Sequence, residues 1–218
     1  MDDKLLIASR VAQELRPGTL VNLGIGLPTL VAGLVPRDAN IFFQSENGIV
    51  GMQSIPEHGL EDDDLTDAGG RPISALPGAA TFDSAMSFGL IRGGHLDVTV
   101  LGGLQVDRNG RLANWMVPGK MVPGMGGAMD LVTGARRVIV AMTHTAKGEH
   151  KIVHELNLPL TSTRCVDLVV TEMAVLRPTP DGMVLQEIAP GVTIEQVRAA
   201  TGTPLIVAEQ VPIMGGAG

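Results

Sequence analysis

Short apolar runs separated by helical or glycine-rich segments constrain the fold of this 218-residue chain more than any other feature. The runs are rich in β-branched residues and lack the polar alternation of a strand with one solvent-exposed face. Strands of this kind belong in a sheet that helices cover on both faces. The sequence therefore predicts an open α/β fold with a mostly parallel sheet. The expected strands are 19–23, 41–43, 98–101, 138–142, 168–171 and 205–208.

Three helices are expected, one before the first strand and two between later strands. Apolar residues at helical spacing predict a helix over 4–16, which Pro17-Gly18 ends. Pro28 opens a helix over 29–34, and a third begins at 128–132. The length fits one domain, 1–218, with a loose tail over about 212–218.

Composition excludes several classes of protein. A net charge of −7 and 2% aromatic residues argue against nucleic-acid binding, which needs clustered cations and stacking rings. No apolar run approaches the roughly 20 residues that cross a bilayer. The start of the chain shows no signal-peptide pattern, and Cys165 alone cannot form an internal disulfide, so a cytoplasmic location is expected. Cys165 opens an apolar run and is interpreted as core packing.

The turn Ser45-Glu46-Asn47-Gly48 follows a strand and carries the clearest chemical signal. Gly48 allows the backbone to fold sharply there. An unperturbed glutamate has a pKa of about 4.3, so Glu46 is ionised at neutral pH. Such a carboxylate can attack an acyl group without a base to activate it. The alternative is an ordinary solvated residue at the end of a strand.

Two glycine loops are candidates for binding. Gly24-x-Gly26 follows a strand, but Thr29 occupies the position of the third glycine in a dinucleotide fingerprint. It is therefore interpreted as a tight strand-to-helix turn. Gly124 to Gly127 leads into a helix, whose free N–H groups can bind a negative oxygen. The sequence contains neither a phosphate-binding P-loop nor a serine-esterase GxSxG motif.

Two clusters have the residue types of metal sites. His144, His150, His154 and Glu155 could suggest zinc, but no cysteine stands at ligand spacing, and solvated loop histidines are preferred. The acidic run 61–64 with Asp67 lacks the alternating ligands and glycine of a calcium loop. It is interpreted as a surface loop. No metal is expected.

Several motifs together resemble the B (β) subunit of family I 3-oxoacid CoA-transferases, of the succinyl-CoA:3-ketoacid type. The resemblance runs from about Leu5 to Ala208 and implies the α/β fold shared by CoA-transferases and some sugar-phosphate isomerases. The motifs are Asn22-Leu23-Gly24-Ile25-Gly26-Leu27-Pro28-Thr29, Gln44-Ser45-Glu46-Asn47-Gly48, Arg92-Gly93-Gly94-His95-Leu96-Asp97, Leu112-Ala113-Asn114-Trp115 and Gly126-Gly127-Ala128-Met129-Asp130-Leu131.

The resemblance implies a mechanism and a set of site residues. Glu46 matches the family's nucleophile, which forms a glutamyl-CoA thioester in ping-pong turnover, and the backbone N–H of Gly127 matches its oxyanion donor. CoA and acyl-CoA would be substrates, with no permanently bound cofactor. The candidate contacts for CoA are Gly24, Gly26, Gly126, Asn114 and Lys120.

The resemblance also implies a partner and substrates. A separate α (A) subunit should complete the enzyme as an A2B2 assembly, and the isolated chain should fold but be inactive. Succinyl-CoA is the expected donor and acetoacetate the first-ranked acceptor, ahead of 3-oxoadipate and simple short-chain acids. The stretch 53–56 departs from relatives and is positioned to reshape the acyl pocket. A ligand-sensing domain and a sugar-phosphate isomerase are the alternatives on this fold.

Overall fold

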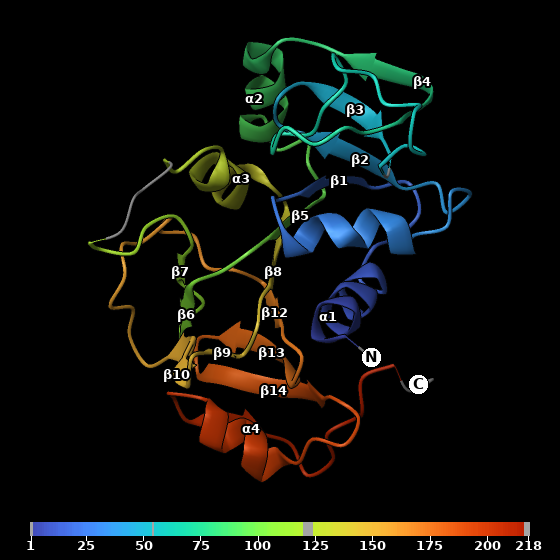
Figure 1. Cartoon of the computed structure of the whole chain (residues 1–218). Coiled ribbons are helices and arrows are strands. Elements are labelled where there is room, and N and C mark those ends of the chain that lie inside the picture. Colours follow the sequence, from blue (N-terminus) through green and yellow to red (C-terminus); the bar gives the residue numbers. More distant parts are fainter. Residues whose placement is uncertain (1, 54, 120–123, 216–218) are drawn as a thin grey trace.

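The computed structural model describes residues 2–53, 55–119 and 124–215. Within these residues a ten-stranded sheet forms the centre of the molecule (Figure 1). Its strands are β1 (Leu20–Leu23), β2 (Phe42–Ser45), β3 (Ile49–Met52), β4 (Ala75–Thr81), β5 (Val98–Leu101), β8 (Arg137–Ala141), β12 (Leu168–Val170), β13 (Ala174–Thr179), β14 (Gly182–Ile188) and β15 (Leu205–Val207).

Short helices and two small sheets complete the described part of the chain. The helices are α1 (Asp3–Ala12), the 3₁₀ helix η1 (Leu27–Leu34), α2 (Ser84–Arg92), α3 (Ala128–Gly134) and α4 (Ile194–Ala200). One small sheet joins β11 (Ile152–Val153), β6 (Gln105–Asp107) and β7 (Leu112–Ala113), and the other joins β10 (Glu149–His150) and β9 (Thr145–Ala146). None of the described helices is long and apolar enough to span a bilayer.

The strand order of the main sheet is β15-β14-β13-β12-β8-β5-β1-β2-β3-β4. The five central strands, from β12 to β2, run parallel to one another. Antiparallel hairpin partners flank them on both sides, with β3 and β4 on one side and β13 and β14 on the other. The prediction of an open, mostly parallel sheet is confirmed. The antiparallel strand β4 lies at the edge, where its mostly exposed residues meet solvent.

Both faces of the sheet are buried, which explains why its central strands are apolar throughout. In β8, Ile139 and Ala141 belong to one core cluster, whereas Val138 and Val140 belong to the other. Residues of α1 pack into the first cluster and residues of α2 and α3 into the second. In Figure 1, α1 lies on one side of β1 and β5, and α2 and α3 lie on the other. The functional residues described below lie on the second face.

The predicted helices are present with altered bounds. The first helix begins at Asp3, where the Asp2 side chain caps it, and ends at Ala12 instead of Arg16. The segment after Pro28 is a 3₁₀ helix, because Thr29 donates its backbone N–H to the carbonyl of Gly26 three residues earlier. The helix at 128 is confirmed and extends to Gly134. Sequence patterns missed α2, whose start is fixed by the side chain of Asp83.

Two predictions about the periphery are wrong. Cys165 is exposed and not in the core, because its strand begins only at Leu168 and the preceding residues belong to a loop. The tail is not loose over 212–214, since Ile213 bridges to Ile188 and Met214 is buried. Residues 216–218 lie outside the described residues.

His144 is also misjudged by the sequence, because it is fully buried and not a solvated loop residue. Its Nδ1 lies 2.9 Å from the Thr171 hydroxyl and its Nε2 lies 2.9 Å from the Thr201 hydroxyl. Burial lowers the pKa of His144 to about 4, and the positive charges of His150 and Lys151 act in the same direction. His150 and His154 are exposed, as predicted. His144 is therefore a neutral ring that links three segments through hydroxyl groups.

This burial predicts a loss of stability in acid. The unfolded chain protonates His144 near pH 6.5, whereas the folded protein does so only near pH 4. The contribution of neutral His144 to the free energy of unfolding is therefore complete above the unfolded pKa. It is lost as pH falls through the folded pKa, by about 3 kcal/mol in total. Urea unfolding of the wild type and of His144→Asn between neutral pH and about pH 4.5 tests this. The wild type should lose more stability than the variant, and parallel pH curves would contradict the expectation.

Candidate active site

Two rows of side chains cross the strands β5, β1 and β2 at their carboxyl ends. The register pairs Asn22 with Thr99 on one side and with Gln44 on the other. Side chains alternate along a strand, so residues two positions further along face the same way. The second row is therefore Leu101, Gly24 and Glu46. Ligand sites of open α/β sheets lie at such carboxyl ends.

A cavity of about 350 Å³ lies over the second row. Gly24 stands between Leu101 and Glu46, and a Cβ there would be 3.1 Å from Leu101 Cδ2. The missing side chain at Gly24 thus leaves the space open. The residues that line the cavity are mostly small or apolar: Gly24, Ile25, Glu46, Leu101, Gly102, Gly103, Leu104, Asn114, Ala128 and Leu131.

Glu46 follows the last residue of β2 and is half-buried at this cavity. Asn22 Nδ2 donates a hydrogen bond of 3.3 Å to Glu46 Oε2. Burial raises the pKa of Glu46; hydrogen bonds from Asn22 and from the backbone N–H of Glu46 oppose this shift, and the nearby negative charge of Asp67 adds to it. A partly dehydrated carboxylate with few hydrogen bonds is a better nucleophile than a fully hydrated one. The surroundings of Glu46 therefore favour a role as nucleophile over that of an ordinary surface residue.

The turn that carries Glu46 depends on Gly48. Its φ of +128° lies outside the range that residues with a Cβ readily adopt. A Cβ at Gly48 would also lie 2.0 Å from the carbonyl oxygen of Phe82. The Gly48 carbonyl accepts a 2.9 Å hydrogen bond from Phe82 N–H, so the turn sits directly against the segment that leads into α2. The expected role of Gly48 in a sharp turn is confirmed.

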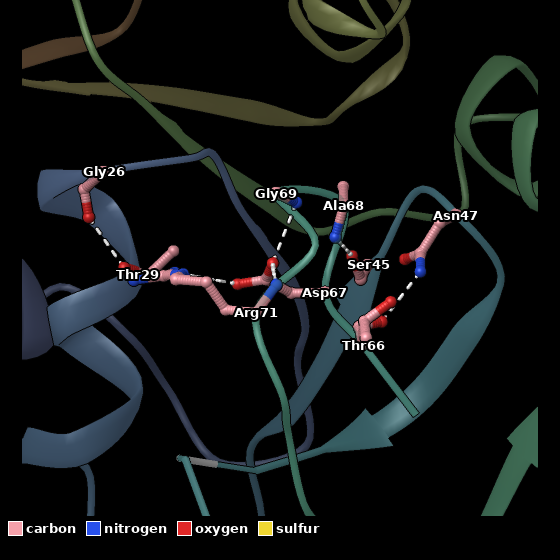
Figure 2. Close-up of polar contacts among 9 residues, drawn as sticks. All are labelled: Gly26, Thr29, Ser45, Asn47, Thr66, Asp67, Ala68, Gly69 and Arg71. Carbon is pink, nitrogen blue, oxygen red and sulfur yellow. Dashed lines mark hydrogen bonds and ion pairs between the residues drawn. The ribbon is translucent and has the colours of Figure 1, made fainter. Parts of the chain in front are cut away.

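The neighbours of Glu46 hold a second turn, residues 66–71, as Figure 2 shows. Asn47 Nδ2 donates to the Thr66 carbonyl at 2.8 Å, and Ser45 Oγ accepts from Ala68 N–H at 2.9 Å. These side chains attach the chain on both sides of the nucleophile candidate to one backbone turn. They therefore limit the movement of Glu46.

Asp67 stabilises this turn from within and is not part of a surface loop, so that prediction is wrong for this residue. It is 7% exposed and forms an ion pair of 2.8 Å with Arg71 (Figure 2). Its other oxygen accepts the backbone N–H groups of Gly69 and Arg71. Residues 61–64 are exposed, as predicted. The described residues include no group of three potential ligands placed to bind a metal.

Gly127 lies beside Glu46, although the two are far apart in the sequence. A Cβ at Gly127 would be 3.3 Å from Glu46 Oε1 and 3.2 Å from Phe88 Cζ. The helices behind these residues are tied together, because Arg92 of α2 pairs with Asp130 of α3 at 2.7 Å. The guanidinium of Arg92 also lies over the Phe88 ring, 5.6 Å from its centroid. The α2–α3 pair thus fixes the start of α3 against the turn after β2.

Of the other residues predicted to contact CoA, some lie at the cavity and others do not. Asn114 lines the cavity, with its Oδ1 accepting a 2.8 Å hydrogen bond from the Thr161 hydroxyl. Gly26 instead caps η1 with φ +92° and accepts from the Thr29 hydroxyl (Figure 2). Gly126 has φ +56° and precedes Gly127. Lys120 lies outside the described residues.

Sequence reasoning missed several residues of this site. Asn22 is a buried amide in an otherwise apolar strand, and that polarity was a signal in its own right. Phe88, which lies against Gly127, and the segment from Leu101 to Leu104, which lines the cavity, had no such signal, because only packing brings them to the site. Gln53 and Ile55 are not among the lining residues and border a separate hollow with Arg71. The described part of 53–56 therefore gives no support to the expectation that it reshapes this pocket.

The sequence pattern of a family described as Coenzyme A transferase matches residues 4–200. The chain belongs to this family. It is 58% identical over 202 residues to the β subunit of acetate CoA-transferase from Escherichia coli K12, covering 92% of each chain. It is 51% identical over 196 residues to the B subunit of succinyl-CoA:3-ketoacid coenzyme A transferase from Helicobacter pylori, covering 89% of this chain and 94% of the relative. The resemblance that the motifs indicated is confirmed, and the chain is an enzyme of the CoA-transferase class.

A solved structure supports the fold. The acyl-CoA transferase YdiF of Escherichia coli O157:H7 superimposes with a TM-score of 0.80 at 23% identity, over 98% of this CoA-transferase chain. This chain spans only 43% of the length of YdiF. The likeness confirms the CoA-transferase fold. More than half of the YdiF chain has no counterpart in this one.

The buried position of Glu46 predicts that the residue lowers stability at neutral pH. Since its folded pKa is raised, its contribution to stability is full below the unfolded pKa and is lost as pH rises through the folded pKa. Glu46→Gln stays neutral and should melt at a higher temperature than the wild type at neutral pH, with the difference shrinking toward about pH 4. Thermal unfolding across this range measures the effect. The exposed Glu57→Gln is the control and should show no such difference.

Proposed function

We propose that this chain is the nucleophile-bearing β subunit of a CoA-transferase, in which Glu46 carries CoA as a thioester between donor and acceptor. The observation that supports this best is the position of Glu46. Its half-buried carboxylate lines a cavity of about 350 Å³ and lies directly beside Gly127. A sugar-phosphate isomerase or a ligand sensor would not account for the Ser45-Glu46-Asn47-Gly48 motif.

The proposed reaction has two matched halves. The Glu46 carboxylate attacks the thioester carbonyl of the donor, giving a mixed anhydride and the free CoA thiolate. The thiolate then attacks the Glu46 carbonyl carbon, which releases the donor acid as carboxylate and leaves glutamyl-CoA. The acceptor carboxylate attacks this thioester, and the same steps run in reverse. One thioester replaces another, so no nucleotide hydrolysis is needed and the kinetics are ping-pong.

Each attack creates a negative oxygen that needs a hydrogen-bond donor. The proposed donor is the backbone N–H of Gly127, which lacks a side chain and so comes close to Glu46. In other enzymes, loss of one such donor costs about 3 kcal/mol of transition-state stabilisation. The proposed contacts for CoA remain Gly24, Gly26, Gly126, Asn114 and Lys120. Among these, Gly24 and Asn114 gain support because they line the cavity.

A second subunit is part of the proposal. The relatives from Escherichia coli K12 and Helicobacter pylori are named as β and B subunits, and this chain covers more than nine-tenths of each. YdiF, by contrast, is more than twice as long as the part that superimposes. Both observations fit a chain that works with a separate α subunit, in an A2B2 assembly by the family resemblance. The cavity beside Glu46 would then be closed by that partner.

The cavity also bears on the substrate. Its described lining residues carry no positive charge, so a second carboxylate on the acyl group would be buried without a counter-ion from this chain. We therefore rank acetoacetate first as acceptor, ahead of 3-oxoadipate. The family resemblance implies succinyl-CoA as donor, and its second carboxylate would meet the same cost. Acetate is a second candidate, because the relative that shares 58% identity is named an acetate CoA-transferase.

Covalent labelling tests the nucleophile. The α/β complex is incubated with acyl-CoA and no acceptor, and peptides are examined by mass spectrometry. CoA should be attached at Glu46 in the wild type and absent in Glu46→Ala. Exchange should fall by about a thousandfold or more in that variant. The isolated chain should show no exchange, and adding the α subunit should restore it. A label on another residue, or an active Glu46→Ala complex, would overturn the assignment.

Competition between acceptors tests the substrate class. Acetoacetate and acetate should each exceed 3-oxoadipate in kcat/KM by about tenfold or more, because tenfold corresponds to about 1.4 kcal/mol of uncompensated charge burial. The monoester of 3-oxoadipate at its far carboxyl group is the matched control. It keeps the length but loses the charge, so it should recover much of the loss. Faster turnover of 3-oxoadipate than of its ester would contradict the ranking.

A further inference from the structure

Four polar side chains form a buried network directly below Glu46. Thr99, Asn22 and Gln44 occupy neighbouring register positions on β5, β1 and β2, and Ser87 reaches them from α2. All four are fully buried. The proposed reaction uses none of Thr99, Gln44 and Ser87. Buried polar groups in an apolar interior need a compensating reason, because each costs free energy unless it is hydrogen-bonded.

The hydrogen bonds of Gln44 can be formed in only one orientation of its amide. Gln44 Nε2 lies 3.0 Å from the Ser45 carbonyl oxygen, which can only accept. The amide nitrogen of Gln44 must therefore face Ser45, and its Oε1 must face Asn22. Ser87 Oγ, 2.8 Å from Gln44 Nε2, takes the second N–H. A backbone carbonyl thus determines how the whole side chain is turned.

The orientation of Gln44 determines that of Asn22 in turn. Gln44 Oε1 accepts a 2.7 Å hydrogen bond, so Asn22 must present its Nδ2 there. The other hydrogen of Nδ2 is then directed to Glu46 Oε2 and to the Gln44 carbonyl, both at 3.3 Å. Asn22 Oδ1 faces the Thr99 hydroxyl, which donates to it at 3.3 Å. A reversed Asn22 amide would place an oxygen, and not a donor, against the Glu46 carboxylate.

We infer that Gln44 is a positioning residue, which orients the Asn22 amide and so keeps a hydrogen-bond donor on Glu46. This inference rests on the proposed role of Glu46 as nucleophile. Through Asn22, Gln44 holds one carboxylate oxygen and leaves the other, Oε1, on the side of Gly127. Gln44 itself touches neither substrate nor the reacting atoms.

Besides Asn22, only the backbone N–H of Glu46 donates to this carboxylate among the described residues, and the charges around it do not replace Asn22. Asp67, from the turn 66–71, is negative, and its own partner is Arg71. On α2 and α3, Arg92 and Asp130 pair with each other. Loss of the Asn22 donor should therefore favour the protonated form of Glu46, and the acid side of the pH–rate profile should move to higher pH.

The test compares two variants in the α/β complex. Gln44→Met has nearly the same shape but cannot orient Asn22. Ser87→Ala removes one partner of Gln44 and leaves its bond to the Ser45 carbonyl, so the orientation should persist. For glutamyl-CoA formation, Gln44→Met should move the acid limb of kcat/KM up by about one pH unit. It should also lower kcat by about tenfold, with KM for acyl-CoA within about twofold. Ser87→Ala should keep the acid limb of kcat/KM at the wild-type pH, even if its melting temperature falls. It therefore controls for a general loss of stability.

A measurement on the wild type keeps the inference testable if Gln44→Met does not fold. With ¹⁵N-labelled asparagine, the Nδ2 resonance of Asn22 should titrate together with the acid limb of the rate. The inference would be overturned if the Asn22 resonance does not titrate. It would also be overturned if the acid limb of kcat/KM lies at the same pH in Gln44→Met and in the wild type. If CoA still attaches at Glu46 in those cases, the proposed function stands and only the role of Gln44 fails. If Glu46 is never labelled, the proposed function itself fails.

Discussion

The parallel pairing of β5, β1 and β2 is the constraint on which the rest of the site depends. Because these strands are in register, Thr99, Asn22 and Gln44 form one row, and Leu101, Gly24 and Glu46 form the next. The lower row is polar, buried and hydrogen-bonded. The upper row carries the Glu46 carboxylate, and the absence of a side chain at Gly24 leaves space beside it. A slip of one residue in β2 would turn both Gln44 and Glu46 to the opposite face of the sheet.

Two further elements restrict the space around Glu46. The hairpin after β2 is attached to the turn 66–71 on one side and pressed against Phe82 on the other, where only glycine fits at position 48. The α2–α3 pair brings Gly127 to the remaining oxygen of Glu46. Each contact restricts the carboxylate, and burial raises its pKa. If Glu46 acts as the proposed nucleophile, its partial burial exchanges some stability at neutral pH for reactivity, as is common in enzyme sites.

Local patterns were informative where burial and backbone geometry act over a few residues. The apolar runs predicted the central parallel strands, and Gly48 marked the sharp turn after β2. Pro17-Gly18 did not mark the end of the first helix, which stops at Ala12. Cys165 was misjudged because an apolar run does not show at which residue the strand begins. His144 was misjudged because its hydroxyl partners, Thr171 and Thr201, are distant in the sequence. The exposed edge strand β4 and the helix α2 were missed, since neither has strong apolar periodicity.

The sequence alone determined the α/β class and the motif resemblance, because these follow from residue types and short spacings. The choice of Glu46 and Gly127 as site residues came through that resemblance. The tertiary structure decided which groups surround Glu46. Asn22, Gln44 and Ser87 come from two strands and a helix, and their meeting depends on strand order and register. Such pairings form between segments distant in the chain. The free energy that selects them comes from burial of the whole sheet, which no short stretch of sequence encodes.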